Sequence, residues 1–447
     1  MAETTEISSP GDIIEHAPMS INQWVVIALC TLLMALDGYD VMSIALAGAG
    51  IAEEWSLSKQ QLGFLLPLEF VGMAVGSVFL GSLSDNLGRK LTIITCLVIL
   101  TIGMGISGLS PNFETLAASR VFTGIGVGGV LAGATALASE YSNGKNRSLA
   151  VLITAAGYTT GVFLVSKVAG PILIEYDWRV IFQLGALISL VLIPVFALLA
   201  PESIGFLERK HHAKAKDKIA RTLKKIGHST EFSLRQQNFQ PAKTDISALF
   251  KDKTARITLV MMICYLGNVL TYYFFVKWMP PAVIDLGYSE AQGTEVLAAI
   301  SLGGLVGTMT MALFSKFFDL KPLMIVALFG SALSVAGFPL FTQSMSSMVW
   351  VGGIGGFWLF AAVGGFFALF AQSFPPAVLA SGTGVVLGFG RGGAIVGPWS
   401  GGILFGAGMT LMVVSPIMAL GSAIAGLSLF MLPARNKSST PDQSKAR

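Results

Sequence analysis

The sequence GSLSDNLGRK, residues 81–90, separates two long apolar stretches and carries charges of both signs. Its small and charged residues each have a physical use in a tight connection between helices. Gly81 has no side chain and allows one helix to approach another closely, and Gly88 permits a sharp turn. Asp85 offers a carboxylate to a helix N-terminus or to the guanidinium of Arg89. The pattern therefore indicates an ordered turn between two helices.

The composition around this turn is that of a membrane protein. Of the 447 residues, 53% are hydrophobic and only 12% are charged, and the mean hydropathy is +0.71. These values lie outside the range of soluble globular domains. A helix needs roughly 20 predominantly apolar residues to cross a bilayer. Twelve such stretches are predicted, at residues 24–46, 60–82, 91–110, 116–139, 148–171, 179–200, 256–281, 291–315, 322–341, 348–372, 380–406 and 409–432.

The distribution of cations predicts the topology. The first 23 residues have no basic segment and no small-residue cleavage site, so we expect no removable signal peptide. Lys and Arg residues gather in alternate loops, and the positive-inside rule then predicts that both termini are cytoplasmic. The predicted organisation is a cytoplasmic N-terminal tail (1–23), a six-helix half (24–200), a cytoplasmic linker (201–255), a second six-helix half (256–432) and a cytoplasmic C-terminal tail (433–447).

The linker contains a candidate amphipathic helix. Ile219, Leu223 and Ile226 recur at helical spacing among cations. One interpretation is a helix that lies on an anionic membrane surface. The other is a solvated, charged linker that only enforces orientation.

The stretch MALDGYDVMSIALAG, residues 34–48, places Asp37 and Asp40 inside an otherwise apolar span. Three residues apart on a helix, they share a face with Thr31 and Ser43. An ionised carboxylate at this depth is expensive, so each must be paired, hydrated or protonated. All four histidines lie outside the predicted spans, so we expect neither an imidazole relay nor a metal site.

Several motifs carry a resemblance to a known family. The turn at 81–90 resembles the signature loop of the major facilitator superfamily. The stretches SRVFTGIGVGG at 119–129 and APESIGFL at 200–207 resemble other patterns found in that superfamily. The tetrad Asp-Gly-Tyr-Asp at 37–40 is similar to the Asp-Gly-x-Asp motif of its aromatic acid:proton symporter family. With GRGGAIVGP at 390–398, the resemblance covers the twelve-helix core. It implies an all-α integral membrane protein with the major facilitator fold.

The resemblance also implies that the loop is a conformational latch between the two halves, which helps to hold an outward-open state. The residues assigned to this latch are Gly81, Asp85, Gly88, Arg89 and Lys90. The alternative is that Arg89 and Lys90 only mark topology.

Asp37 and Asp40 are predicted to carry the coupled proton. Burial disfavours the charged form of a carboxylate and a nearby cation favours it, so a paired acid on the transport route can exchange its proton as the route opens to either side. The alternative is a structural pair satisfied by a cation on another helix.

An anionic substrate needs a buried cation, and Arg391, Arg120 and Lys167 are candidates. We favour Arg391, which shares a face with Gly384 and Gly388, because small neighbours leave room and a guanidinium grips a carboxylate with two hydrogen bonds. The alternative for Arg391 is an ion pair with one of the two aspartates. Arg120 is a second predicted substrate ligand, and its alternative is an interfacial position with the charge at the membrane surface.

An aromatic ring needs an apolar slot. Trp358, in the middle of the tenth span, is the predicted stacking residue, and Tyr39 is predicted to contact the substrate as well; core packing is the alternative. Glu69 is left between pairing with Lys167 or Arg120 and tuning a second proton site. For Glu140 we expect contact with Arg147.

The sequence therefore predicts a bacterial inner-membrane symporter, active as a monomer, that imports a small aromatic carboxylate with protons by alternating access. It needs no cofactor beyond the proton gradient and binds no nucleic acid or metal. The absence of a Gly-Pro-x-x-Gly-Gly pattern from the fifth span favours a symporter over an exporter. Rival interpretations are a symporter for another organic anion, sugar or phosphate, a proton-driven exporter, and a sensor or enzyme on the same scaffold; the spans show no cluster suited to an enzyme.

Overall fold

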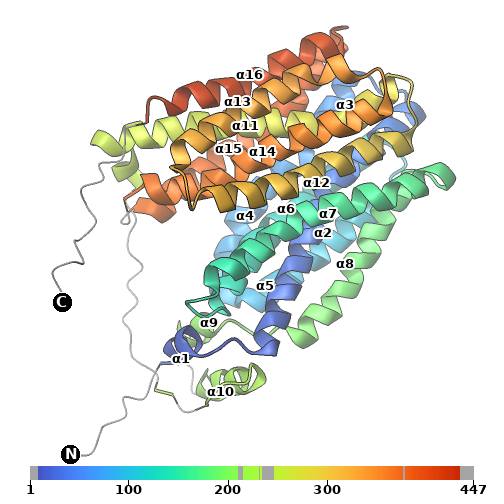
Figure 1. Cartoon of the computed structure of the whole chain (residues 1–447). Helices are drawn as coiled ribbons and strands as arrows, with labels where there is room; N and C mark the ends of the chain where they lie inside the picture. The colour runs from blue at the N-terminus through green and yellow to red at the C-terminus, as the bar shows by residue number, and fades with distance from the viewer. Residues whose placement is uncertain (1–8, 210–214, 231, 234–245, 376–377, 433–447) are drawn as a thin grey trace, which may run out of the picture.

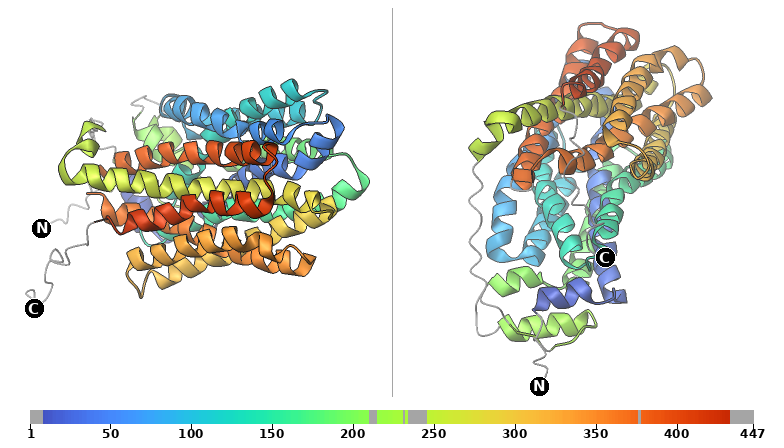
Figure 2. Two further views of the ribbon diagram at one scale, coloured as in Figure 1. Left: turned by 90° about the horizontal axis from the view of Figure 1, so that it is seen from above. Right: turned by 60° about the vertical axis from the view of Figure 1, so that its left-hand side comes forward.

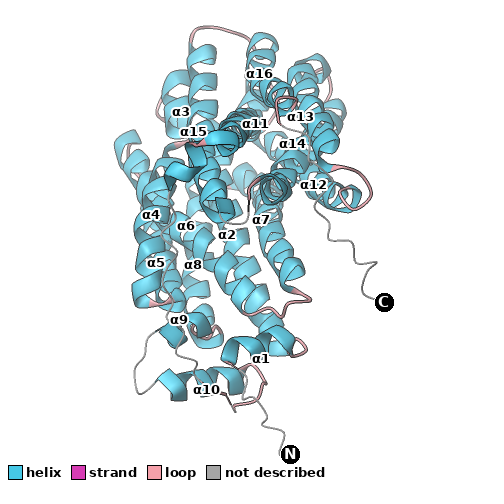
Figure 3. Ribbon diagram, turned by 90° about the vertical axis from the view of Figure 1, so that its left-hand side faces the viewer, coloured by secondary structure: helices cyan, strands magenta, loops and turns pink. Residues whose placement is uncertain are grey.

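The computed structural model describes residues 9–209, 215–230, 232–233, 246–375 and 378–432. Every regular element in this part of the chain is helical (Figure 3). The elements are α1 (Pro10–His16), α2 (Ile21–Glu54), α3 (Lys59–Leu65), α4 (Leu68–Leu87), α5 (Arg89–Ser107), α6 (Phe113–Glu140), α7 (Arg147–Glu175), α8 (Arg179–Leu199), α9 (Ile204–Arg209), α10 (Ala215–Lys225), η1 (Ile246–Phe250), α11 (Asp252–Asp285), α12 (Glu290–Phe314), α13 (Leu320–Gly337), η2 (Phe338–Phe341), α14 (Met345–Ser373), α15 (Leu379–Gly406) and α16 (Leu411–Leu429).

The predicted spans correspond to these helices one by one. Within the described residues, eleven spans meet the length and hydropathy expected of a membrane crossing. The remaining stretch, predicted at 380–406, corresponds to helix α15. The second span is broken into α3 and α4 around Pro67, because proline has no N–H to continue the helix.

The spans form two six-helix halves (Figure 1). Helices α2 and α4–α8 make the first half, and α11–α16 make the second. The short helix α3 leaves the first half and packs against α15. We call the end of the bundle at which α2 begins, with α1 and α10 beside it, the terminal end, and the opposite end the far end (Figures 1 and 2).

Small residues set the close helix crossings within each half. A Cβ added to Gly72 of α4 would lie 2.0 Å from the Val121 carbonyl oxygen of α6. In the second half, a Cβ on Gly307 of α12 would lie 2.0 Å from the Phe357 carbonyl oxygen of α14. Lipid provides no hydrophobic drive for helices to associate, so tight backbone contact of this kind holds the halves together.

Close contacts between the two halves gather at the far end. A Cβ on Gly63 of α3 would lie 2.5 Å from the Cα of Gly402 on α15. Nearby, Lys59 Nζ lies 2.5 Å from Asp285 Oδ1 of α11. Toward the terminal end of α15, by contrast, a Cβ on Gly384 would meet no atom within 4 Å. The far end is therefore the closed end.

In the described part of the linker, helix α10 packs against the protein, whereas residues 210–214, 231 and 234–245 lie outside the described residues. Helix α10 is amphipathic, but Ile219, Leu223 and Ile226 are at most 1% exposed because they pack against the rest of the protein. Asn22 Nδ2 donates to the Lys225 carbonyl at 2.6 Å, and Lys225 Nζ donates to the Leu198 carbonyl at 2.8 Å. The expectation of a helix lying on a membrane surface is wrong, since the apolar face is already covered.

Helix α1 ties the same region to the first half. Asn143 Nδ2 donates to the Ala17 carbonyl at 2.9 Å, and Arg147 pairs with Glu15. The expected contact between Glu140 and Arg147 is therefore replaced: Arg147 reaches α1, and Glu140 pairs with Arg89.

Candidate functional site

Arg120 of α6 lies at the centre of a buried ionic cluster. Its Nη2 donates to Asp40 Oδ1 of α2 and to Glu69 Oε2 of α4, both at 2.7 Å. The side chains of all three residues are at most 1% exposed. Arg120 therefore does not reach the membrane surface. Glu69 was expected to pair with either Lys167 or Arg120, and its pairing with Arg120 is confirmed.

The helix pattern that carries Arg120 explains this geometry. Gly124 and Gly128 fall on the same face, and a Cβ on Gly124 would lie 2.0 Å from the Glu69 carbonyl oxygen. The two glycines let α4 and α6 touch along their backbones. This contact brings Glu69 within reach of the guanidinium.

Lys277 of α11 extends the cluster across the interface, and the sequence analysis missed it. Its Nζ donates to Glu69 Oε1 at 2.5 Å and to the Val41 carbonyl of α2. It also lies 5.3 Å from the centroid of the Phe70 ring. The signal that could have found it is a lysine inside the predicted seventh span, 256–281, which the structure extends as α11 to Asp285.

Asp37 is close to this cluster but has no ionic partner in the part of the chain that the structure describes. It is 3% exposed, and its Oδ1 is buried without a hydrogen bond among the described residues. The charges of Asp40, Glu69 and Arg391 all act on it electrostatically. A carboxyl group buried in this way is stable only when it is neutral or when a cation approaches it.

Aromatic rings surround Asp37 on the side of the second half. Tyr272 and Tyr273 of α11 have centroids 4.7 Å apart, and Tyr272 lies 4.9 Å from Phe360 of α14. Tyr158 of α7 lies beside both tyrosines and Asp37, and its hydroxyl is buried. We call Tyr158, Tyr272, Tyr273 and Phe360 the aromatic cluster beside Asp37.

Arg391 of α15 reaches across the interface to α4 of the first half. Its Nη1 donates to Ser77 Oγ and, at 3.4 Å, to the Met73 carbonyl of α4. No carboxylate pairs with it in the part of the chain that the structure describes, so neither Asp37 nor Asp40 is its ion-pair partner here. The guanidinium is only partly buried.

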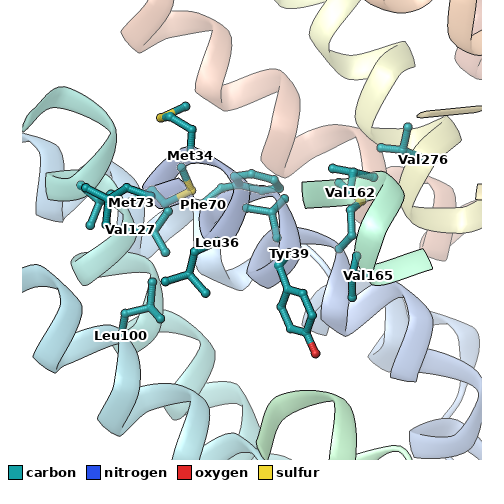
Figure 4. Close-up of a cluster of buried hydrophobic side chains, with 14 of the residues drawn as sticks. Met34, Leu36, Tyr39, Phe70, Met73, Leu100, Val127, Val162, Val165 and Val276 are labelled. Atoms are coloured by element: carbon teal, nitrogen blue, oxygen red, sulfur yellow. The ribbon is translucent and has the colours of Figure 1, made fainter. Parts of the chain in front are cut away.

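Two predicted aromatic contacts lie elsewhere. The Tyr39 ring extends away from Phe70 (Figure 4), and its hydroxyl donates to the Ile181 carbonyl of α8 at 2.8 Å. A Cβ on Gly330 of α13 would lie 2.5 Å from the Trp358 ring, so this indole packs against α13. Neither side chain belongs to the aromatic cluster beside Asp37, and their substrate contacts stay predictions. Lys167 is exposed and is not part of the ionic cluster.

The loop at 81–90 contacts its own half. Gly88 has φ +99°, a left-handed conformation that favours glycine. Arg89 Nε lies 3.4 Å from Glu140 Oε1, and the Lys90 backbone N–H donates to Glu202 Oε1 at 3.1 Å. The side chain of Asp85 lies outside the described residues, and the latch assignment stays a prediction.

Twelve spans in two halves around a buried ionic cluster define a multi-pass membrane transporter rather than an enzyme. The chain belongs to the Major Facilitator Superfamily, whose family model matches residues 27–398. The fold agrees: the partially occluded, inward-open xylose transporter XylE from Escherichia coli superposes with a TM-score of 0.74, at 17% identity, over 94% of this chain and 100% of that one.

Curated relatives extend over nearly the whole chain. A gallate transporter from Pseudomonas putida is 26% identical, with 95% of both chains covered. The 3-(3-hydroxy-phenyl)propionate transporter of Escherichia coli K12 is 27% identical, with 93% of this chain and 95% of the relative covered. The 4-hydroxybenzoate transporter PcaK of Pseudomonas aeruginosa is 26% identical, with 94% of each covered.

Proposed function

We propose that this protein imports a small aromatic carboxylate together with protons by alternating access. The observation that carries the proposal is Asp37: a buried carboxyl group that has no ionic partner among the described residues, adjacent to a balanced ionic cluster and to the tyrosines of the aromatic cluster. The names of the relatives support the substrate class.

Asp37 is the proton carrier in this proposal, and Asp40 sets its surroundings. Asp40 already shares Arg120 with Glu69, so its charge is compensated. Asp37 lacks such compensation, and it gains a proton more cheaply than it keeps a charge. Water that reaches it from one end and then the other exchanges this proton.

Arg391 and the tyrosines form the proposed substrate site. A substrate carboxylate accepts two hydrogen bonds from the guanidinium of Arg391, whose described bonds engage only Nη1. The ring of the substrate then contacts Tyr272 and Tyr158 edge to face. Arg120 stays a second predicted ligand, since its Nε and Nη1 are unpaired among the described residues.

The orientation follows from the charge distribution. The terminal end carries the basic loops, so it faces the cytoplasm of a bacterial inner membrane. With the far end closed, the structure is then inward-facing. The described partners of Arg89 and Lys90, Glu140 and Glu202, lie outside α11–α16, as is expected of a latch that engages only in the outward-open state.

Uptake by purified protein in liposomes tests the proposal. An imposed inward proton gradient should concentrate radiolabelled 4-hydroxybenzoate, and a protonophore should abolish this accumulation. Unlabelled benzoate, gallate and protocatechuate should compete, whereas succinate, xylose and phosphate should not. Competition by the second group alone, or outward flux only, would contradict the proposal.

A conservative variant tests the anion site. Arg391→Lys keeps the charge but loses the two-pronged geometry, so the half-saturation concentration should rise about tenfold, equivalent to about 1.4 kcal/mol. The control is Arg221→Lys on the exposed face of α10. An unchanged half-saturation concentration for Arg391→Lys would reject its role.

A further inference from the structure

Lys277 belongs to the second half, but its contacts are with the first. Its ammonium bonds to Glu69 and to the Val41 carbonyl, and it lies over the ring of Phe70. Lys277 is 0% exposed. Within the described residues, no helix of α11–α16 provides its ammonium with a partner. Separation of the halves at this point would strip the ammonium of all these interactions.

The charges of the first half are balanced only while Lys277 is in place. Asp40 and Glu69 are two carboxylates that share one guanidinium, Arg120. When these three groups are ionised, the first half has one negative charge in excess, and Lys277 compensates it. An uncompensated charge in a buried site is costly. If Lys277 withdraws, the first half needs another positive charge.

The other groups that face this site do not supply that charge. Asp37 is a further carboxyl group, and the tyrosines that interact with it, Tyr158 and Tyr273, are neutral when protonated. Arg391 acts on Asp37 but bonds to α4 at a separate point. A proton from water is the remaining source.

We propose that Lys277 is the positioning residue that links opening of the far end to proton uptake. Withdrawal of its ammonium from Glu69 leaves the first half one positive charge short, and one proton, passed on by Asp37 and bound by Asp40 or Glu69, replaces it. When the far end closes again, Lys277 returns and the proton leaves to the terminal end. This inference rests on the proposed proton-coupled transport and assigns its coupling to a single ion pair.

A cysteine at Gly48 reports the state of the far end. A Cβ at this position of α2 would lie 3.7 Å from Pro281 of α11, so a thiol there is shielded while the halves touch. The native Cys30, Cys96 and Cys264 are buried and are replaced by alanine. Labelling with a bulky maleimide is followed in detergent, where the reagent reaches both ends.

The matched reference is Asp217→Cys on exposed α10. The labelling rate at Gly48→Cys is divided by the labelling rate of this reference at the same pH. With Lys277 present, the relative rate at Gly48→Cys should rise as the pH falls, by up to about tenfold per pH unit for one proton. Lys277→Met should raise the rate about tenfold or more at pH 7 and remove its pH dependence. Lys277→Arg should restore both properties.

A second variant guards against misfolding. Lys277→Met alone leaves Glu69 partly unpaired, so Lys277→Met with Glu69→Gln removes both charges together and should label quickly at every pH. Equal rates with and without Lys277, or an unchanged pH dependence in its absence, would overturn the inference. Aromatic acid uptake with such labelling would leave the proposed function intact, whereas pH-linked labelling without uptake would reject the proposed substrate instead.

Discussion

Gly38 of α2 lies directly against the backbone carbonyl of Tyr158 on α7. A Cβ at Gly38 would be 2.1 Å from that oxygen, which no side chain can accommodate without a backbone shift. The neighbouring crossings are equally close, since a Cβ on Gly161 would lie 1.9 Å from the Ala35 carbonyl oxygen. The glycine between the two aspartates is therefore a packing residue that keeps Asp37 next to Tyr158.

Gly38→Ala should force α2 and α7 apart and destabilise the protein by about 1–3 kcal/mol, the usual cost of overpacking. Thermal unfolding in detergent measures this loss. Gly105→Ala on α5 is the control, because a Cβ there would meet nothing within 4 Å and alanine favours a helix. Equal melting temperatures for the two variants would contradict the packing role.

The two aspartates of α2 should respond differently to neutralisation. Asp40→Asn removes a partner of Arg120 and should destabilise the protein, by less than the about 3–5 kcal/mol typical of a broken buried pair because Glu69 remains. Asp37→Asn removes no described partner and should leave the melting temperature unchanged, while uphill uptake in liposomes is lost.

The exposed variant Asp217→Asn on α10 controls both measurements of the aspartate variants. Full accumulation of substrate by Asp37→Asn would show that this carboxyl group is not the proton carrier. A larger loss of stability for Asp37→Asn than for Asp40→Asn would contradict the assigned pairing.

Gly63→Ala should prevent the far end from closing, since its Cβ would meet the Gly402 backbone. Spin labels at Glu53→Cys and Leu286→Cys, exposed positions on the two halves near this end, should move apart in double electron–electron resonance. Gly384→Ala on α15, where a Cβ has open space, is the matched control. An unchanged distance distribution for Gly63→Ala would argue against a glycine contact that holds the far end closed.

Glu202 should stabilise the start of α5. Its Oε1 accepts from the backbone N–H groups of Lys90 and Ser203, at 3.1 and 2.9 Å, and a carboxylate at a helix N-terminus is favourable. Glu202→Ala should cost about 0.5–2 kcal/mol, as the loss of a helix cap does. Chemical denaturation measures it, with Glu53→Ala at an exposed position as the control; equal stabilities would exclude the cap.

The spans and their order could be predicted because lipid imposes a simple rule on composition and length. Arg120 with its two spaced glycines was also visible as a pattern, and the structure gives that pattern a reason in the contact with α4. The pairing of side chains was not predictable in the same way. Whether Glu69 meets Arg120, Lys167 or Lys277 depends on which helices are neighbours and how each is rotated.

The partners of side chains in the linker and in the proposed substrate site were likewise not predictable from the sequence. The helical spacing of Ile219 and Leu223 predicts an apolar face, but it does not say what covers that face, and the protein itself covers it. Trp358 was chosen by its depth in a span, and Tyr39 was predicted to contact the substrate as well. The depth of a residue in a span does not determine which way its side chain points. The Trp358 ring packs against α13, and the Tyr39 hydroxyl bonds to α8.

Most of the residues proposed to handle the proton and several of those proposed to bind the substrate lie on opposite sides of the linker in the sequence. Asp37, Asp40, Glu69 and Arg120, which handle the proton in our proposal, are all encoded before the linker, whereas Arg391 and Tyr272, proposed to meet the cargo, are encoded after it. Lys277 is the single proton-handling residue encoded with the second group. Substitutions after the linker can therefore alter the contacts of Arg391 and Tyr272 with the cargo and leave the carboxylates of α2 and α4 unchanged, although Tyr158, the other proposed ring contact, is encoded with the first group.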